Sequence, residues 1–234
     1  MSIRNNKKII GIIGGMGPIS SIKFYADIIE YCQVEQGAYE NSNYPYLRIT
    51  NLPVPDLINN TNQMAVTKQM IIDELIELEK TGISYFAIIC NTVHMFIEEF
   101  RDAVNVPVLS IVEEAVKELK KKDSKKVLLL ATPTTLTSKI FQTALETVNI
   151  KAIVPNAGEI EFLGKIILKL VANKQTIEDK VMLGDLIRRH IVHHDIDSIL
   201  LGCTELSFGI DSDDYNIPIY NAVNILVKEI VLLS

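Results

Sequence analysis

Short apolar runs alternate along the chain with longer segments in which apolar residues recur every three or four positions. The short runs have the length of buried strands, and the longer segments have the period of amphipathic helices. Strand–helix alternation of this kind favours an α/β fold with mainly parallel sheets covered by helices. We predict strands at Ile9–Ile13, Tyr46–Thr50, Tyr85–Ile89, Val127–Ala131, Ile150–Val154 and Ser198–Leu201. We predict helices at Ser20–Tyr31, Met64–Lys80, Val93–Phe100, Glu113–Lys121, Thr137–Thr147 and Lys180–His194.

The chain also repeats itself. Each half begins with a lysine pair and an apolar run, Lys7–Ile13 and Lys125–Ala131, and each half later ends an apolar strand in a cysteine, Cys90 or Cys203. Such a repeat indicates two copies of one structural unit. We therefore predict two pseudo-symmetric three-layer α/β/α domains, residues 1–112 together with a C-terminal helix at 221–234, and residues 113–220.

The charge balance and the cysteine count exclude several classes of protein. The chain carries 23 Lys and Arg against 29 Asp and Glu, a net charge of −6, and its basic runs are short. We therefore expect no nucleic-acid partner. No apolar stretch reaches the roughly 18 residues that a spanning helix needs, and the first residues lack the pattern of a signal peptide, so we expect no membrane partner. Three cysteines do not make a disulfide framework, which favours the reducing cytoplasm.

Two of the three cysteines stand where open α/β sheets bind their ligands, at the carboxyl end of a strand. Cys90 and Cys203 each precede a segment that we expect to be helical. Because the N-terminus of a helix stabilises an anion, the sequence predicts that both thiols ionise readily. A matched pair of such thiols is suited to acid and base catalysis. Cys32 lies within a predicted helix and has no such context, so we interpret it as a buried core residue.

The loops that follow the first strand of each half carry candidate binding groups. Glycines in Gly14–Pro18 allow a ligand to approach the backbone closely, and this loop includes Met16 and Gly17. Its spacing does not match a dinucleotide or phosphate loop, so a small anion such as a carboxylate fits better. The matching loop of the second half, Ala131–Thr135, supplies hydroxyl and backbone N–H donors, although ordinary turn chemistry would explain the same residues.

Several motifs resemble the cofactor-independent aspartate/glutamate racemases, and in particular their aspartate racemase branch. The motifs are Gly11–Pro18, Pro53–Asp56, Cys90–His94, Ile111–Glu114, Leu129–Thr132 and Gly202–Glu205. The resemblance covers nearly the whole chain. It implies two pseudo-symmetric domains with the active site in the cleft between them, usually as a homodimer, and no cofactor. It also implies that an amino acid is the substrate. One cysteine would remove the Cα proton as a thiolate, and the other would deliver a proton to the opposite face.

The resemblance assigns further roles around the two thiols. The substrate carboxylate needs donors as it gains negative charge, and the candidates are Asn91, Thr92, Thr132, Thr134, Thr135 and Thr204. Thr92 and Thr204 fit helix caps equally well. His94 and Glu205 are supporting residues that would tune a thiol or orient the substrate ammonium, and Glu205 also fits a simple first-turn acid. We expect no metal site, because His190, His193 and His194 resemble a solvated helix end.

The sequence departs from the family pattern where specificity is set. Leu57 and Val171 stand where aspartate-specific relatives carry cations, and Asn221 stands where an Asp is usual. Arg48 and Lys165 are the cations that would replace them at the side chain of the substrate. Aspartate or glutamate is therefore the default substrate, and a racemase of broad specificity for non-acidic amino acids is the alternative. Two other functions stay open: a maleate isomerase-like or decarboxylase-like enzyme on the same fold, and a carboxylate-binding protein without catalytic activity.

Overall fold

The computed structural model describes residues 7–58 and 61–234, and their strands form two parallel four-stranded sheets. The first sheet has the order β2-β1-β3-β4, and the second has the order β6-β5-β7-β8. The bounds of the first set are β1 Ile9–Gly14, β2 Tyr46–Asn51, β3 Tyr85–Ile88 and β4 Val108–Leu109. Those of the second set are β5 Lys126–Ala131, β6 Lys151–Ile153, β7 Ser198–Gly202 and β8 Ile219–Asn221. The second order repeats the first, strand for strand, as the sequence repeat predicts.

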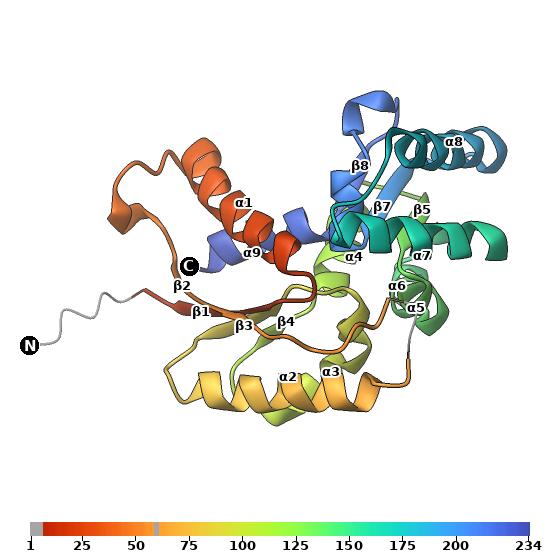
Figure 1. The fold of residues 1–234 in the computed structure, drawn as a ribbon. Coiled ribbons are helices and arrows are strands. Elements are labelled where there is room, and N and C mark those ends of the chain that lie inside the picture. Colours follow the sequence, from red (N-terminus) through yellow and green to blue (C-terminus); the bar gives the residue numbers. More distant parts are fainter. Residues whose placement is uncertain (1–6, 59–60) are drawn as a thin grey trace, which may run out of the picture.

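Helices cover both faces of each sheet, so the described part of the chain forms two three-layer units (Figure 1). The helices of the first half are α1 Pro18–Gln36, α2 Met64–Glu79 and α3 Ile97–Ala103. Those that follow are α4 Ile111–Lys121, α5 Pro133–Ser138, α6 Ile140–Glu146, α7 Ala157–Val171, α8 Ile177–His194 and α9 Ala222–Leu233. The C-terminal α9 returns to pack against both α1 and α4. Short 3-10 turns are present at Asn41–Asn43, Thr92–Phe96, Thr204–Phe208 and Ser212–Asp214.

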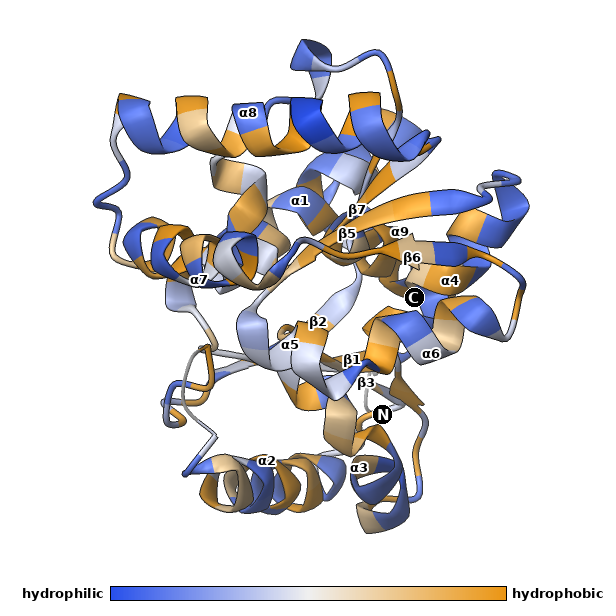
Figure 2. Cartoon of the chain, turned by 90° about the vertical axis from the view of Figure 1, so that its right-hand side faces the viewer, coloured by the Kyte–Doolittle hydropathy of each residue, from blue (hydrophilic) through white to orange (hydrophobic). Residues whose placement is uncertain are grey.

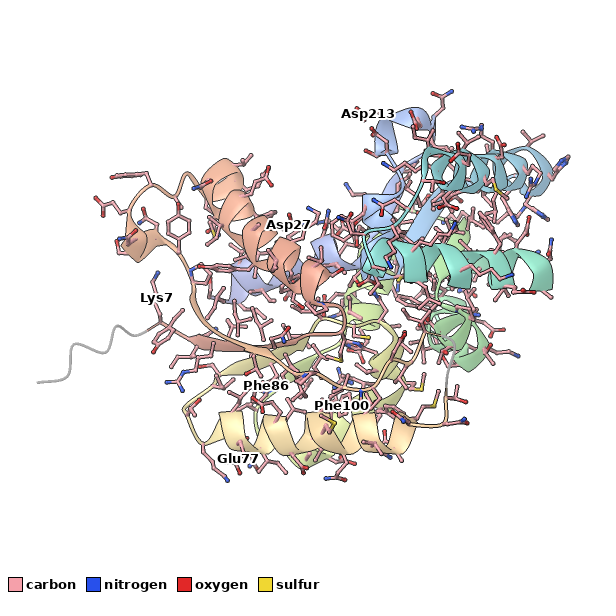
Figure 3. The ribbon with its side chains drawn as sticks, in the orientation of Figure 1. Lys7, Asp27, Glu77, Phe86, Phe100 and Asp213 are labelled. Atoms are coloured by element: carbon pink, nitrogen blue, oxygen red, sulfur yellow. The ribbon has the colours of Figure 1, made fainter. Side chains whose placement is uncertain are left out.

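Alternate residues of the central strands supply opposite faces of the core. Ile12 of β1 packs toward α1, α4 and α9, whereas Ile13 packs toward α2 and α3. Phe86 and Phe100 lie between the first sheet and α2, while Glu77 lies on the outer face of that helix (Figure 3). Figure 2 shows the same division in the second half, where β5 and β7 are hydrophobic and α8 carries a hydrophilic surface. Burial on both faces explains why these strands are apolar without alternation.

The structure differs from the sequence predictions in several places, one of which is α7, a helix of 15 residues that was not among the predicted helices. Strands β4 and β8 were not predicted, because two or three residues are too few to show a period. The predicted helix Thr137–Thr147 is two helices, since Lys139 adopts a left-handed conformation with φ 59° and separates α5 from α6. The helix predicted at Val93–Phe100 is instead a 3-10 turn followed by α3.

The strand order fixes where a ligand can bind. In each sheet the chain runs from one central strand to the edge strand beside it, and later from the other central strand to the opposite edge strand. The loops that follow the two central strands therefore turn in opposite directions. In the first sheet these are the loops after β1 and β3, and in the second sheet they are the loops after β5 and β7. The loops that carry the sequence motifs are therefore the ones that leave a crevice between them.

Candidate active site

Both cysteines of the repeat line one cavity of about 190 Å³ at the ends of the central strands. Cys203 directly follows β7, and Cys90 follows β3 after one further buried residue. Cys203 is buried and Cys90 is partly buried, and neither forms a disulfide. Cys32 is a fully buried residue of α1 that packs into the core and does not line the cavity. The repeat thus brings two thiols from different lobes to one space.

The rest of the cavity wall comes from both halves of the chain. The first half contributes the loop after β1, the loop after β2, one residue of α2 and the segment after β3: Gly15–Pro18, Val54–Ile58, Thr67 and Cys90–Val93. The second half contributes Thr132, Val171 and Gly202–Glu205. Of the predicted binding residues, Met16, Gly17, Asn91, Thr92, Thr132 and Thr204 therefore lie in the wall.

Asn91 is a polar side chain of the wall whose amide donors and acceptor are available to a ligand. It is 3% exposed, and neither its amide nitrogen nor its amide oxygen has a hydrogen-bond partner among the described residues. A buried amide without partners costs free energy, so such a group indicates a ligand that completes its hydrogen bonds. Asn91 can donate to a carboxylate and accept from an ammonium, which are the two charged groups of an amino acid.

Three threonines join the two lobes beside the thiols. The Thr92 hydroxyl lies 3.1 Å from the hydroxyl of Thr132 and 2.9 Å from that of Thr135. Thr132 caps α5 by accepting from the backbone N–H of Thr135. Thr135 is buried behind the wall, and Thr134 uses its hydroxyl to donate to the Ile58 carbonyl. Thr134 and Thr135 therefore do not line the cavity as predicted but support the residues that do.

Glu205 is a buried carboxylate that joins the lobes on the other side of the cavity. Its Oε1 accepts from the Ser20 hydroxyl at 2.8 Å and from the backbone N–H of Gly17 at 3.3 Å. Its Oε2 accepts from the Thr204 hydroxyl and from the Cys203 thiol, the latter at 3.3 Å. Each oxygen thus has two donors, which is how a buried carboxylate is stabilised. Glu205 is more than a first-turn acid, because it directly contacts one of the two thiols.

The structure contradicts the prediction that both thiols ionise readily. Burial raises the pKa of Cys90 to about 11. Hydrogen bonds from the backbone N–H groups of Val93 and Thr92 lower this pKa, but by less than burial raises it. Burial also raises the pKa of Cys203 well above its usual value, and the negative charge of Glu205 raises it further. The segments after both cysteines are 3-10 turns of five residues, so no long helix dipole opposes desolvation.

His94 lies outside the cavity wall and contacts the backbone of Cys90. It is 2% exposed and does not line the cavity, and its Nδ1 donates to the Cys90 carbonyl at 2.8 Å. A carbonyl only accepts, so the proton of the neutral ring is on Nδ1. Burial lowers the pKa of His94 to about 4. His94 thus holds the backbone of Cys90 in place as a neutral imidazole.

Two cations predicted near the substrate do not reach the cavity. Arg48 lies on the edge strand β2 and is absent from the wall. Lys165 lies on the outside of α7, where it pairs with Glu161 at 2.6 Å. The structure therefore places neither cation at the wall, where a substrate side chain would be bound. Asn221 caps α9 through the backbone N–H of Val223 and also lies outside the cavity.

Other residues differ from their predicted roles or were not predicted. His190 is buried and bonds to Glu159 at 3.1 Å, so it is not part of a solvated helix end. In residues 7–58 and 61–234, no three His, Cys, Asp or Glu side chains are grouped to hold a metal ion. The wall also includes Asp56 and Thr67, which sequence reasoning missed as site residues. The Pro53–Asp56 motif was the available signal for Asp56, whereas nothing in its surroundings marked Thr67.

The fold and the cavity together define a two-lobed α/β protein with a two-thiol site between its lobes. The family model for Asp/Glu/hydantoin racemases matches residues 13–230. The chain is 32% identical over 222 residues to the broad specificity amino-acid racemase RacX of Bacillus subtilis, covering 95% of this chain and 96% of that protein. In the described parts of the chain, no helix is long and apolar enough to cross a membrane.

Solved structures agree with this assignment. An aspartate racemase homologue from Pyrococcus horikoshii superposes with a TM-score of 0.81 at 30% identity, covering 97% of this chain and 98% of that one. The aspartate racemase of Picrophilus torridus superposes with a TM-score of 0.84 at 29% identity, covering 96% and 93%. This chain belongs to the Asp/Glu/hydantoin racemase family. It is a racemase, an enzyme of the isomerase class.

Proposed function

We propose that this racemase interconverts the L- and D-forms of an amino acid without a cofactor, and that Cys90 and Cys203 are its two acid/base groups. The observation that carries this proposal is the shared cavity, which two thiols from different lobes line at the ends of β3 and β7. Its volume of about 190 Å³ suits a small molecule. A binding protein would need neither thiol, which argues against a carboxylate-binding protein without catalytic activity.

The proposed reaction removes a proton from one face of the substrate Cα and delivers a proton to the opposite face. The thiolate of one cysteine forms an S–H bond as the Cα–H bond breaks, and the electron pair passes into the carboxylate as an enediolate. The thiol of the other cysteine then protonates Cα on the opposite face and becomes a thiolate. For both contacts to be at attack distance, the two sulfurs must lie about 7 Å apart with Cα between them.

The α-ammonium group of the substrate supplies a positive charge that favours ionisation of a thiol in the cavity. A buried thiol with a raised pKa ionises more easily when a cation enters beside it, and the α-ammonium of an amino acid is such a cation. The enediolate needs donors, and the amide nitrogen of Asn91 lies at the wall without a partner among the described residues. The Gly17 N–H and the Thr204 hydroxyl already donate to Glu205, so they hold that carboxylate in place beside Cys203.

Isotope exchange at Cα tests the proposal. Incubation of the protein with single L-amino acids in D₂O, followed by NMR and chiral chromatography, should show deuterium at Cα together with the D-enantiomer. Cys90→Ser and Cys203→Ser should each abolish the D-enantiomer, whereas Cys32→Ser serves as the matched control and should keep activity, because Cys32 lies outside the cavity. Conversion of a maleate-like acid or an arylmalonate, with no exchange of any amino acid, would contradict the proposal in favour of the isomerase or decarboxylase alternative.

The resemblance also supports three finer proposals. The first concerns the substrate: the resemblance to this branch favours aspartate, whereas Leu57 and Val171 in the cavity wall favour a non-acidic amino acid. We propose a homodimer, which sedimentation equilibrium would test. We also propose a cytoplasmic location, which the three unpaired cysteines support and which cell fractionation would test.

A further inference from the structure

The described wall of the cavity contains negative side chains and no positive ones. Besides the two thiols, its titratable residues are Asp56 and Glu205. No Lys, Arg or His side chain lies in the wall as far as the chain is described. The field inside the cavity therefore attracts cations and repels anions, apart from the local donors that can hold one carboxylate.

The two carboxylates differ in how many of their hydrogen-bond acceptor positions the protein already occupies. Glu205 already accepts from two donors at each oxygen. Asp56 is an exposed residue of the loop after β2, and its Oδ1 accepts from the backbone N–H of Ile58 at 2.8 Å. Asp56 forms no ion pair with the rest of the described chain. Its charge is therefore not cancelled by the protein.

The wall around Asp56 is apolar. Val54 and Leu57 come from the same loop, and Leu57 packs into the core against α2. Val171, the last residue of α7, faces them from the second half of the chain. The two lysines of α7 are held elsewhere, because Lys165 pairs with Glu161 and Lys169 pairs with Asp179 at 2.6 Å.

An acidic side chain would have no partner in these surroundings. The donors at the strand ends are needed by the α-carboxylate, and a second carboxylate would lie among Leu57, Val171 and the charge of Asp56. Desolvation without a counter-ion and repulsion by a like charge both oppose binding. A neutral side chain meets neither penalty, and a cationic side chain is attracted by Asp56.

Building on the proposed racemase function, we infer that the site accepts amino acids with neutral or cationic side chains and discriminates against aspartate and glutamate. Val171 and Leu57 determine this selection by filling the wall with apolar groups, and Asp56 reinforces it with an uncancelled negative charge. The selection acts on binding and so is separate from the proton transfers at Cα.

Isosteric pairs of substrates test the inference. L-asparagine against L-aspartate and L-glutamine against L-glutamate differ in charge but hardly in shape. Calorimetric titration should show the amide of at least one pair binding at least about tenfold more tightly than its acid, and kcat/KM for Cα exchange should follow the same order. Equal or tighter binding of both acids overturns the inference. So does failure of both amides and of L-methionine and L-lysine to bind.

Charge substitutions test which residues are responsible. Val171→Lys adds a cation and should raise the affinity for the acids by at least about tenfold, whereas the matched control Val171→Gln adds similar length without charge and should not. Asp56→Asn should raise it by a smaller factor. An equal effect of Val171→Lys and Val171→Gln overturns the electrostatic argument. Binding that follows the inferred order, with no Cα exchange, would contradict the proposed function and leave the selectivity upheld.

Discussion

Acidification should destabilise this protein through one buried imidazole. His94 titrates near 4 in the folded chain, because burial opposes its charged form, and near 6.5 when unfolded. The unfolded chain therefore binds more protons between these values. The stabilisation is complete above the unfolded pKa and is lost as pH falls toward the folded one. Linkage gives a loss of about 2 kcal/mol in the free energy of unfolding from about pH 7.5 to about pH 5.

Urea unfolding at a series of pH values, followed by circular dichroism, measures this loss. In the His94→Asn variant the amide nitrogen can replace Nδ1 as donor to the Cys90 carbonyl but does not titrate, so about 2 kcal/mol of the pH dependence should disappear. His193→Asn is the matched control, because it removes an exposed imidazole from the end of α8 and should keep the His94 contribution. An unchanged pH dependence in His94→Asn would refute the reasoning.

Three further substitutions probe the wall of the cavity. Gly15→Ala should lower the free energy of unfolding by about 3 kcal/mol or more in urea titrations, because Gly15 has φ 96° and an added Cβ would lie 2.5 Å from the Leu52 carbonyl oxygen. Glu205→Gln should lower the pKa of the Cys203 thiol by removing a nearby negative charge, which ultraviolet titration of the thiolate would detect as a shift to lower pH; no shift would contradict the contact. Asn91→Ala should reduce kcat/KM about 100-fold without changing the melting temperature much, and full activity would exclude Asn91 as a substrate ligand.

Much of the architecture follows from the sequence, because its central strands are buried on both faces. Short apolar runs such as those of β1, β5 and β7 are stable in the centre of a sheet that helices cover on both faces. The sequence repeat then predicts that the two sheets have matching strand orders. The edge strands β4 and β8 escape prediction, since two or three residues show no period. The break at Lys139 also leaves no signal, because a lysine is an ordinary helix residue.

The candidate site was predicted in part, and its errors have a common origin. Motif positions locate Cys90 and Cys203 at strand ends, which topology then brings to one cavity. Side-chain contacts and burial depend on the tertiary structure and cannot be deduced from a motif. The prediction therefore placed Lys165 at the substrate, whereas it pairs with Glu161, and it overestimated the acidity of the two thiols. Glu205 shows the same limit, because its contacts with Ser20 and Gly17 join residues far apart in the sequence.

Early isotope distribution tests the central claim most directly, namely that two thiols act on opposite faces of one Cα. An L-amino acid that the protein turns over is incubated in D₂O and stopped at low conversion, and both enantiomers are separated and analysed by mass spectrometry. The account predicts deuterium at Cα in the D-product while the recovered L-substrate keeps its protium, because one sulfur removes the hydrogen and the other supplies the solvent isotope. Equal deuterium in both enantiomers at that stage would indicate a single base and would contradict the account.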